Sequence, residues 1–171
     1  MIKKTLYIFT ILFFLFLFSI TTIKISKEPT MMNTMTVQKE EIGKIIIKKI
    51  NLEKNLYEIN SPQNTVEKNV TILKESTPPI EKESIMILAA HSGTGDIAYF
   101  NSLDKLELDD SITLIYKNKK YTYAVKNIWE EPKTGYINFN KEKGKQLILT
   151  TCSPTNRKKQ LVINCIEKII H

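Results

Sequence analysis

The sequence predicts a mainly β fold, and three observations support this prediction. The apolar clusters are short, of strand length, and rich in Ile, Val, Thr and Tyr. Turn-forming residues separate successive clusters. Only residues 98–106 have the three-residue apolar spacing that is typical of a short helix. About seven strands in one domain favour a closed barrel or a β-sandwich.

Each predicted strand is an apolar cluster bounded by turn signals. In chain order the clusters are Ile45–Ile47, Val70–Leu73, Ile85–Ala90, Ile112–Tyr116, Tyr121–Val125, Gln146–Thr151 and Leu161–Ile166. The intervening turns contain Asn60-Ser61-Pro62, Pro78-Pro79, Lys117–Lys120, Glu131-Pro132 and Lys143-Gly144. The helical segment carries Phe100, Leu103 and Leu106. The folded domain is expected to begin near Ile42.

The net charge of the chain says more about topology than about binding partners. The 171 residues carry +7, of which +4 lies in residues 1–27 and +3 in the remainder. A domain at +3 gives little support to nucleic-acid binding, so no such partner is expected. With 5 Gly, 6 Pro and 2 Cys, the chain is neither collagen-like nor a disulfide scaffold.

Residues 5–23 are predicted to form a transmembrane helix. These 19 residues carry no charge, and as a helix they would span about 28 Å. The run is longer than the apolar core of about 7–15 residues in a cleavable signal peptide, which favours an uncleaved anchor. Lys3 and Lys4 precede it and place the N-terminus in the cytoplasm. We therefore expect a cytoplasmic tail (1–4), an extracellular tether (24–41) and an extracellular domain (42–171) at the cell membrane.

Two residues at strand ends are candidates for catalysis. His91 follows the apolar run 85–90 and precedes a Gly-rich loop, a usual position for a functional group on a rigid support. Cys152 follows the run 146–151, where a nearby cation or imidazole would favour the reactive thiolate. Taken alone, each residue also fits a purely structural role.

Other residues give weaker signals. The strand alternation places Cys165 with its apolar neighbours, which predicts a small core residue. Arg157 is the only arginine, and its rigid donor fork suits an oxyanion as well as it suits an exposed loop. There is no Cys-x-x-Cys and no second histidine near His91, so no metal site is expected.

The two strand-end motifs together resemble those of the sortases, cysteine transpeptidases of the Gram-positive cell surface. Leu88-Ala89-Ala90-His91 is similar to the histidine motif of that family, and Leu149-Thr150-Thr151-Cys152 is similar to its cysteine motif. They occur in the family's order, about 60 residues apart. The resemblance covers about residues 42–170, with an opening strand pair in 42–58. It implies a closed or nearly closed sortase-like β-barrel of about seven to eight strands with one or two short helices. The subclass stays open, with class D-like sortases as one option.

The sequence departs from the family pattern at the arginine. In the family this residue usually stands directly before the apolar run of the last strand. That position holds Gln160, with Lys159 before it and Arg157 three positions earlier. We expect Arg157 to fill the role, with Lys159 and Gln160 as alternatives.

The resemblance implies a transpeptidation that needs no cofactor. Cys152 would attack the Thr carbonyl of a Leu-Pro-x-Thr-Gly-like sorting signal, and His91 would act as general acid and base. Arg157 would stabilise the oxyanion, and Thr151 would position the substrate. The acceptor would be an amine of a cell-wall precursor or of a pilin. Two alternatives remain: an extracytoplasmic Cys/His hydrolase, and a catalytically degenerate wall-binding module.

Overall fold

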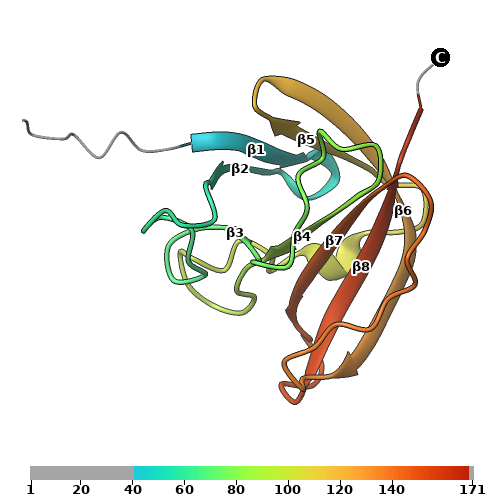
Figure 1. The fold of residues 1–171 in the computed structure, drawn as a ribbon. Coiled ribbons are helices and arrows are strands. Elements are labelled where there is room, and N and C mark those ends of the chain that lie inside the picture. The colour runs from blue at the N-terminus through green and yellow to red at the C-terminus, as the bar shows by residue number, and fades with distance from the viewer. Residues whose placement is uncertain (1–40, 170–171) are drawn as a thin grey trace, which may run out of the picture. The chain divides into compact units, whose positions relative to one another are not determined.

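The computed structural model describes residues 41–169, which form eight strands and two short 3-10 helices (Figure 1). The strands are β1 (Glu41–Ile47), β2 (Leu52–Tyr57), β3 (Thr71–Ile72), β4 (Ser84–Ala89), β5 (Ser111–Tyr116), β6 (Lys119–Pro132), β7 (Lys145–Cys152) and β8 (Lys159–Glu167). The helices are η1 (Lys48–Ile50) and η2 (Leu103–Lys105).

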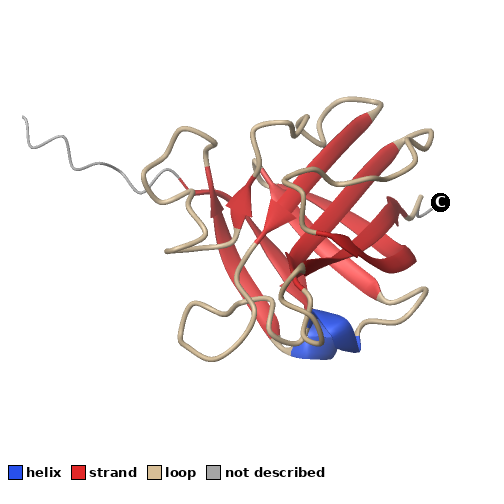
Figure 2. Cartoon of the chain, turned by 90° about the horizontal axis from the view of Figure 1, so that it is seen from below, coloured by secondary structure: helices blue, strands red, loops and turns tan. Residues whose placement is uncertain are grey.

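All eight strands belong to one sheet that curls into a nearly closed barrel (Figure 2). Their order is β2-β1-β5-β6-β8-β7-β4-β3, and the edge strands β2 and β3 approach each other. Every pair is antiparallel except β4 and β7, which run parallel. The predicted mainly β barrel with short helices is therefore confirmed. The predicted transmembrane segment 5–23 lies outside the described residues, and residues 41–169 contain no helix long and apolar enough to cross a bilayer.

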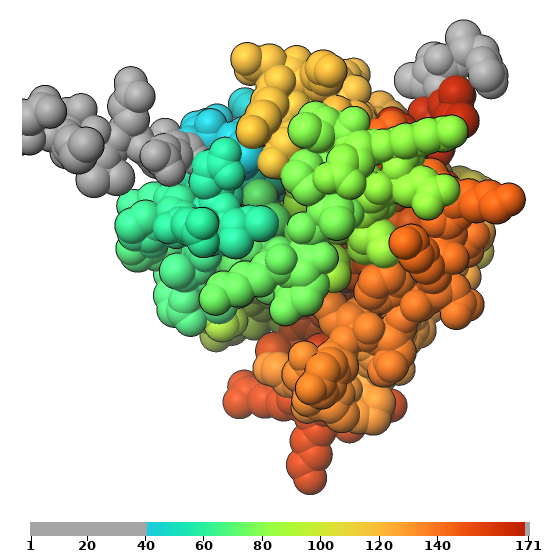
Figure 3. All heavy atoms as spheres, viewed as in Figure 1, coloured from blue at the N-terminus to red at the C-terminus, as the bar shows by residue number. Residues whose placement is uncertain are grey.

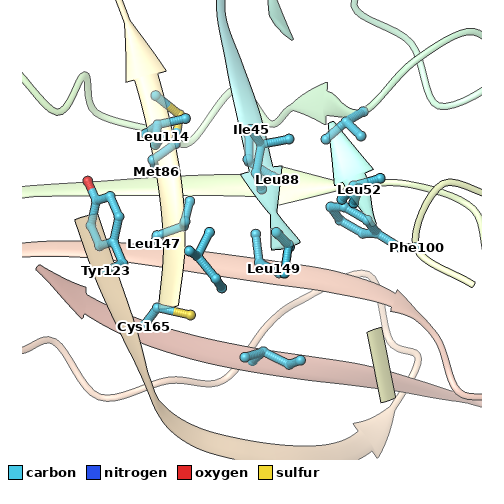
Figure 4. Close-up of a cluster of buried hydrophobic side chains, with 14 of the residues drawn as sticks. Ile45, Leu52, Met86, Leu88, Phe100, Leu114, Tyr123, Leu147, Leu149 and Cys165 are labelled. Atoms are coloured by element: carbon cyan, nitrogen blue, oxygen red, sulfur yellow. The ribbon is translucent and has the colours of Figure 1, made fainter. Parts of the chain in front are cut away.

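Strand alternation divides the side chains of β7 and β8 between two apolar clusters. Leu147, Leu149 and Cys165 point into the barrel (Figure 4), and together with Ile163 they belong to its main core. The intervening residues point outward, where Ile87 of β4, Ile148 of β7 and Val162 of β8 form a small second cluster. The prediction that Cys165 is a core residue is confirmed, because the side chain is fully buried. Burial raises the pKa of its thiol above the ordinary range, which leaves it neutral.

Each of the seven predicted strands overlaps an observed one, and the main difference concerns β6. This strand continues seven residues past the predicted end at Val125 and stops at Pro132. A bulge between Val125 and Asn127 shifts its register against β8, and such bulges bend and twist a strand. The predicted helical segment contains only the 3-10 turn η2, and its three apolar residues are buried as expected.

One glycine is required for the close approach of two strands. A Cβ on Gly43 of β1 would lie 1.9 Å from the backbone oxygen of Ile115 in β5. A larger residue here would therefore push β1 away from β5.

Candidate active site

His91 and Cys152 lie at the adjoining ends of β4 and β7. These strands are parallel, so their carboxyl ends meet at the same edge of the barrel, and their register pairs Ala89 with Thr150. His91 and Cys152 each follow two residues later on their own chain segment. Both are partly exposed. The structure thus brings together the two residues that the sequence motifs single out.

Hydrogen bonds fasten these two strand ends to each other. Thr151 Oγ1 donates to Ala90 O at 2.7 Å, and Ser92 Oγ donates to Cys152 O at 2.8 Å. The first bond joins the residues directly before Cys152 and His91, and the second joins the residue directly after His91 to the backbone of Cys152. His91 O also accepts from Phe100 N at 3.0 Å, which ties the histidine backbone to the buried Phe100. Within residues 41–169, no hydrogen bond joins the imidazole to Sγ.

The thiol of Cys152 contacts a cation that the sequence reasoning missed. Lys133 Nζ lies 3.1 Å from Cys152 Sγ. Lys133 is the first residue of the β6–β7 segment (133–144), directly after the end of β6. Glu131-Pro132 predicts a turn just before Lys133, but the strand itself is expected to end at Val125. Nothing in the sequence therefore predicts that Lys133 lies beside Cys152.

A buried polar group lies opposite Cys152. Gln160 of β8 pairs with Cys152 on one side and with Glu131 of β6 on the other. Its Nε2 donates to Glu131 Oε1 at 2.8 Å and to Tyr136 O at 2.6 Å. Asn138 also donates to the Glu131 carboxylate through its backbone and side-chain nitrogens. Burial alone would raise the pKa of Glu131, but the hydrogen bonds from Asn138 and Gln160 outweigh it and lower that pKa.

The β6–β7 segment is held against the outer face of β7 and β8. Ile137 and Phe139 pack on the second apolar cluster. At the far end of the segment, Gln146 Nε2 donates to Asn140 O at 3.0 Å, and Gln146 Oε1 accepts from Glu142 N at 2.9 Å. In Figure 3 this orange segment covers the lower right of the face toward the viewer. Lys133 therefore extends from an anchored segment.

The other predicted site residues have different surroundings. Arg157 is exposed in the β7–β8 turn (153–158), and in the described part of the chain its guanidinium has no hydrogen-bond or ion-pair partner. Lys159, the first residue of β8, is also exposed. Thr151 is buried, and its hydroxyl hydrogen is used in the bond to Ala90 O. Among residues 41–169, no cluster of His, Cys, Asp and Glu could hold a metal ion.

The arrangement suits nucleophilic chemistry. A part-exposed thiol with a cation at hydrogen-bond distance has the surroundings of a reactive cysteine. A histidine at the neighbouring strand end supplies a side chain that can act as general acid and base. Cys152 ends β7 and His91 follows the end of β4 by two residues, so both groups stand at one edge of the barrel.

Comparisons with known proteins show which family the chain belongs to. A family model described as the Sortase domain matches residues 45–167. Sortase C1 from Streptococcus agalactiae has a similar structure, with a TM-score of 0.67 and 28% identity over 77% of this chain and 69% of that chain. No curated protein sequence matches the chain.

Two further solved structures share the fold at lower identity. Sortase C from Streptococcus pneumoniae has a TM-score of 0.67 and 21% identity, covering 77% of this chain and 70% of that chain. Sortase A from Corynebacterium diphtheriae has a TM-score of 0.66 and 20% identity, covering 78% of this chain and 63% of that chain. The family match covers most of the chain and contains both strand-end motifs. The chain therefore belongs to the sortase family.

Proposed function

We propose that the protein is a cysteine transpeptidase that cleaves a Leu-Pro-x-Thr-Gly-like sorting signal and transfers the new carboxyl end to an amine. The observation that carries this proposal is the position of Cys152 and His91 at the adjoining ends of β4 and β7. Membership of the sortase family supports it.

The first half of the reaction forms a thioester. The Cys152 thiolate attacks the Thr carbonyl carbon, so that a C–S bond forms and the carbonyl π electrons move to oxygen. When the oxyanion collapses, the C=O bond re-forms and the Thr–Gly C–N bond breaks. His91, as imidazolium, gives its proton to the departing Gly amine. Arg157, the arginine expected from the sequence, would donate hydrogen bonds that stabilise the oxyanion.

The second half transfers the acyl group. An acceptor amine gives a proton to His91 and attacks the thioester carbon, the new amide forms, and the thiolate leaves. The acceptor would be an amine of a cell-wall precursor or of a pilin. No step requires a cofactor.

The predicted anchor gives the enzyme access to both substrates. We propose that residues 5–23 hold the protein in the cell membrane, with the N-terminus inside and the domain outside. Anchoring raises the effective concentration of an enzyme near substrates at the same surface. A thiol reagent that cannot cross membranes should label Cys152 in intact cells; labelling only after lysis would contradict this topology.

The function can be tested with the full-length chain in detergent. A labelled sorting-signal peptide is incubated with and without an amine acceptor, and the products are separated by mass. A transpeptidase yields the peptide–amine conjugate, whereas a hydrolase yields only the free acid with or without the acceptor. Cys152→Ala should abolish both products, and Cys165→Ala is the matched control that should retain them. Absence of turnover for every sorting-signal variant would favour the wall-binding module.

A further inference from the structure

A lysine directly after the end of β6 contacts the proposed nucleophile. Lys133 Nζ lies 3.1 Å from Cys152 Sγ, within hydrogen-bond distance of sulfur. The ion pairs of the described residues use other lysines, namely Lys44, Lys49, Lys126 and Lys145. No carboxylate in residues 41–169 therefore competes with Cys152 for the Lys133 ammonium.

The sheet places Lys133 on the same side as Cys152. Glu131, Gln160 and Cys152 lie opposite one another across β6, β8 and β7, so their side chains share the outer face. Lys133 stands two residues after Glu131, and its backbone N–H continues the β6–β8 ladder by donating to Lys158 O at 2.9 Å. The side-chain alternation of β6 thus continues to Lys133 and places its side chain on the outer face with Cys152.

The residue at the position expected for arginine has no donor left for a substrate. Each N–H of the Gln160 amide is used, one by Glu131 Oε1 and one by Tyr136 O. Gln160 instead holds the β6–β7 segment at Tyr136, which lies three residues after Lys133. Gln160 therefore supports the segment that carries the cation and does not provide the charge itself.

We propose that Lys133 is a catalytic residue of this enzyme, acting as the counter-charge of the Cys152 thiolate and then of the oxyanion. This inference rests on the proposed transpeptidase function. As the C–S bond forms, the negative charge moves from sulfur to the carbonyl oxygen, only two bonds away. The flexible four-carbon stem of lysine lets the ammonium follow the charge. The proton that the leaving amine receives still comes from His91.

The test compares four variants of the full-length chain in detergent: Lys133→Met, Lys133→Arg, Arg157→Met and Lys141→Met. Lys141 lies exposed in the same β6–β7 segment and is the matched control for losing one charge. Two rates are measured at neutral pH. One is alkylation of Cys152 by iodoacetamide, which needs no substrate and follows the thiolate population. The other is kcat for peptide transfer to an amine.

We expect Lys133→Met to lower kcat by about 10-fold or more, since loss of one oxyanion donor costs about 10²–10³ in kcat. The same variant should slow alkylation of Cys152, because loss of the neighbouring cation lowers the thiolate population. Lys133→Arg should recover most of the loss, which a merely structural role would not predict. Lys141→Met should change neither rate.

Two outcomes would overturn the inference. One is an active wild type with Lys133→Met within about twofold of it in both rates. The other is a large loss for Arg157→Met with none for Lys133→Met, which would assign the role to the arginine. If the wild type shows no transfer but Lys133→Met still slows alkylation, the proposed function fails while the action of Lys133 on the thiol stands.

Discussion

The two faces of the sheet formed by β6, β7 and β8 are built in opposite ways. The inner face contributes apolar residues, such as Leu149 and Cys165, to a large core and leaves a buried hydroxyl, that of Tyr123, without a hydrogen-bond partner in the described residues. The outer face contributes two fully buried apolar residues, Ile148 and Val162, and its polar groups Glu131 and Gln160 are bonded to each other. The inner face therefore sets stability, and the outer face sets the geometry around Cys152.

The largest expected effect comes from opening a cavity in each cluster. Leu149→Ala removes a fully buried side chain from the barrel and should lower the free energy of unfolding by about 2–5 kcal/mol. Phe139→Ala removes a partly buried ring from the outer cluster and should cost about 1–2 kcal/mol. Urea unfolding measures both losses.

For the reactivity of Cys152, Phe139→Ala should have a larger effect than Leu149→Ala, the reverse of their order in stability. Phe139→Ala loosens the β6–β7 segment and should slow alkylation of Cys152 by about threefold or more, whereas Leu149→Ala should leave it nearly unchanged in the folded protein. If both variants slowed alkylation equally, the division of roles between the two faces would be wrong.

An intermediate effect is expected from the outer polar network. Glu131→Gln replaces the carboxylate that accepts from Gln160 and Asn138, and should lower the free energy of unfolding by about 1–2 kcal/mol at neutral pH. Because the pKa of Glu131 is lowered in the fold, this contribution is present above the unfolded-state pKa and disappears as the pH falls through the folded-state value.

Urea unfolding of wild type and Glu131→Gln between about pH 6 and pH 3 measures this dependence. The difference between the two proteins should shrink as the pH falls. Glu83→Gln is the matched control, since Glu83 is exposed and its carboxylate has no hydrogen-bond or ion-pair partner among residues 41–169. A difference that stayed constant across this range would show that the Glu131 charge is not what stabilises the network.

The smallest effect is expected inside the barrel. Tyr123→Phe removes the buried hydroxyl that has no partner in the described residues, so the stability should stay level or rise by up to about 1 kcal/mol. Thermal unfolding followed by circular dichroism would detect it. A clear destabilisation would mean that the hydroxyl is bonded in solution.

Much of the barrel could be predicted because its strands carry local signals. The run Ile85–Ala90 is apolar on both faces, since β4 has the core on one side and the outer cluster on the other. The end of β6 could not be located in this way. Residues 126–132 include Lys126 and Asn127 and follow a bulge, so their alternation is out of phase with residues 119–125.

The site was predictable where it depends on strand ends and not where it depends on a long connection. His91 and Cys152 each follow an apolar run, and the parallel pairing of β4 and β7 brings them together. The contact of Lys133 with Cys152 joins residues 19 positions apart. It depends on the β6–β8 register and on the anchoring of the β6–β7 segment, neither of which leaves a local pattern.

Mass spectrometry of the full-length chain with a Leu-Pro-x-Thr-Gly-like peptide tests the central claim most directly. The account predicts that, without an acceptor amine, the protein gains the mass of the peptide fragment that ends in Thr. The added mass should lie on Cys152 and should disappear when an amine is added. An unmodified protein across a panel of sorting-signal peptides, while iodoacetamide still modifies Cys152, would contradict the account.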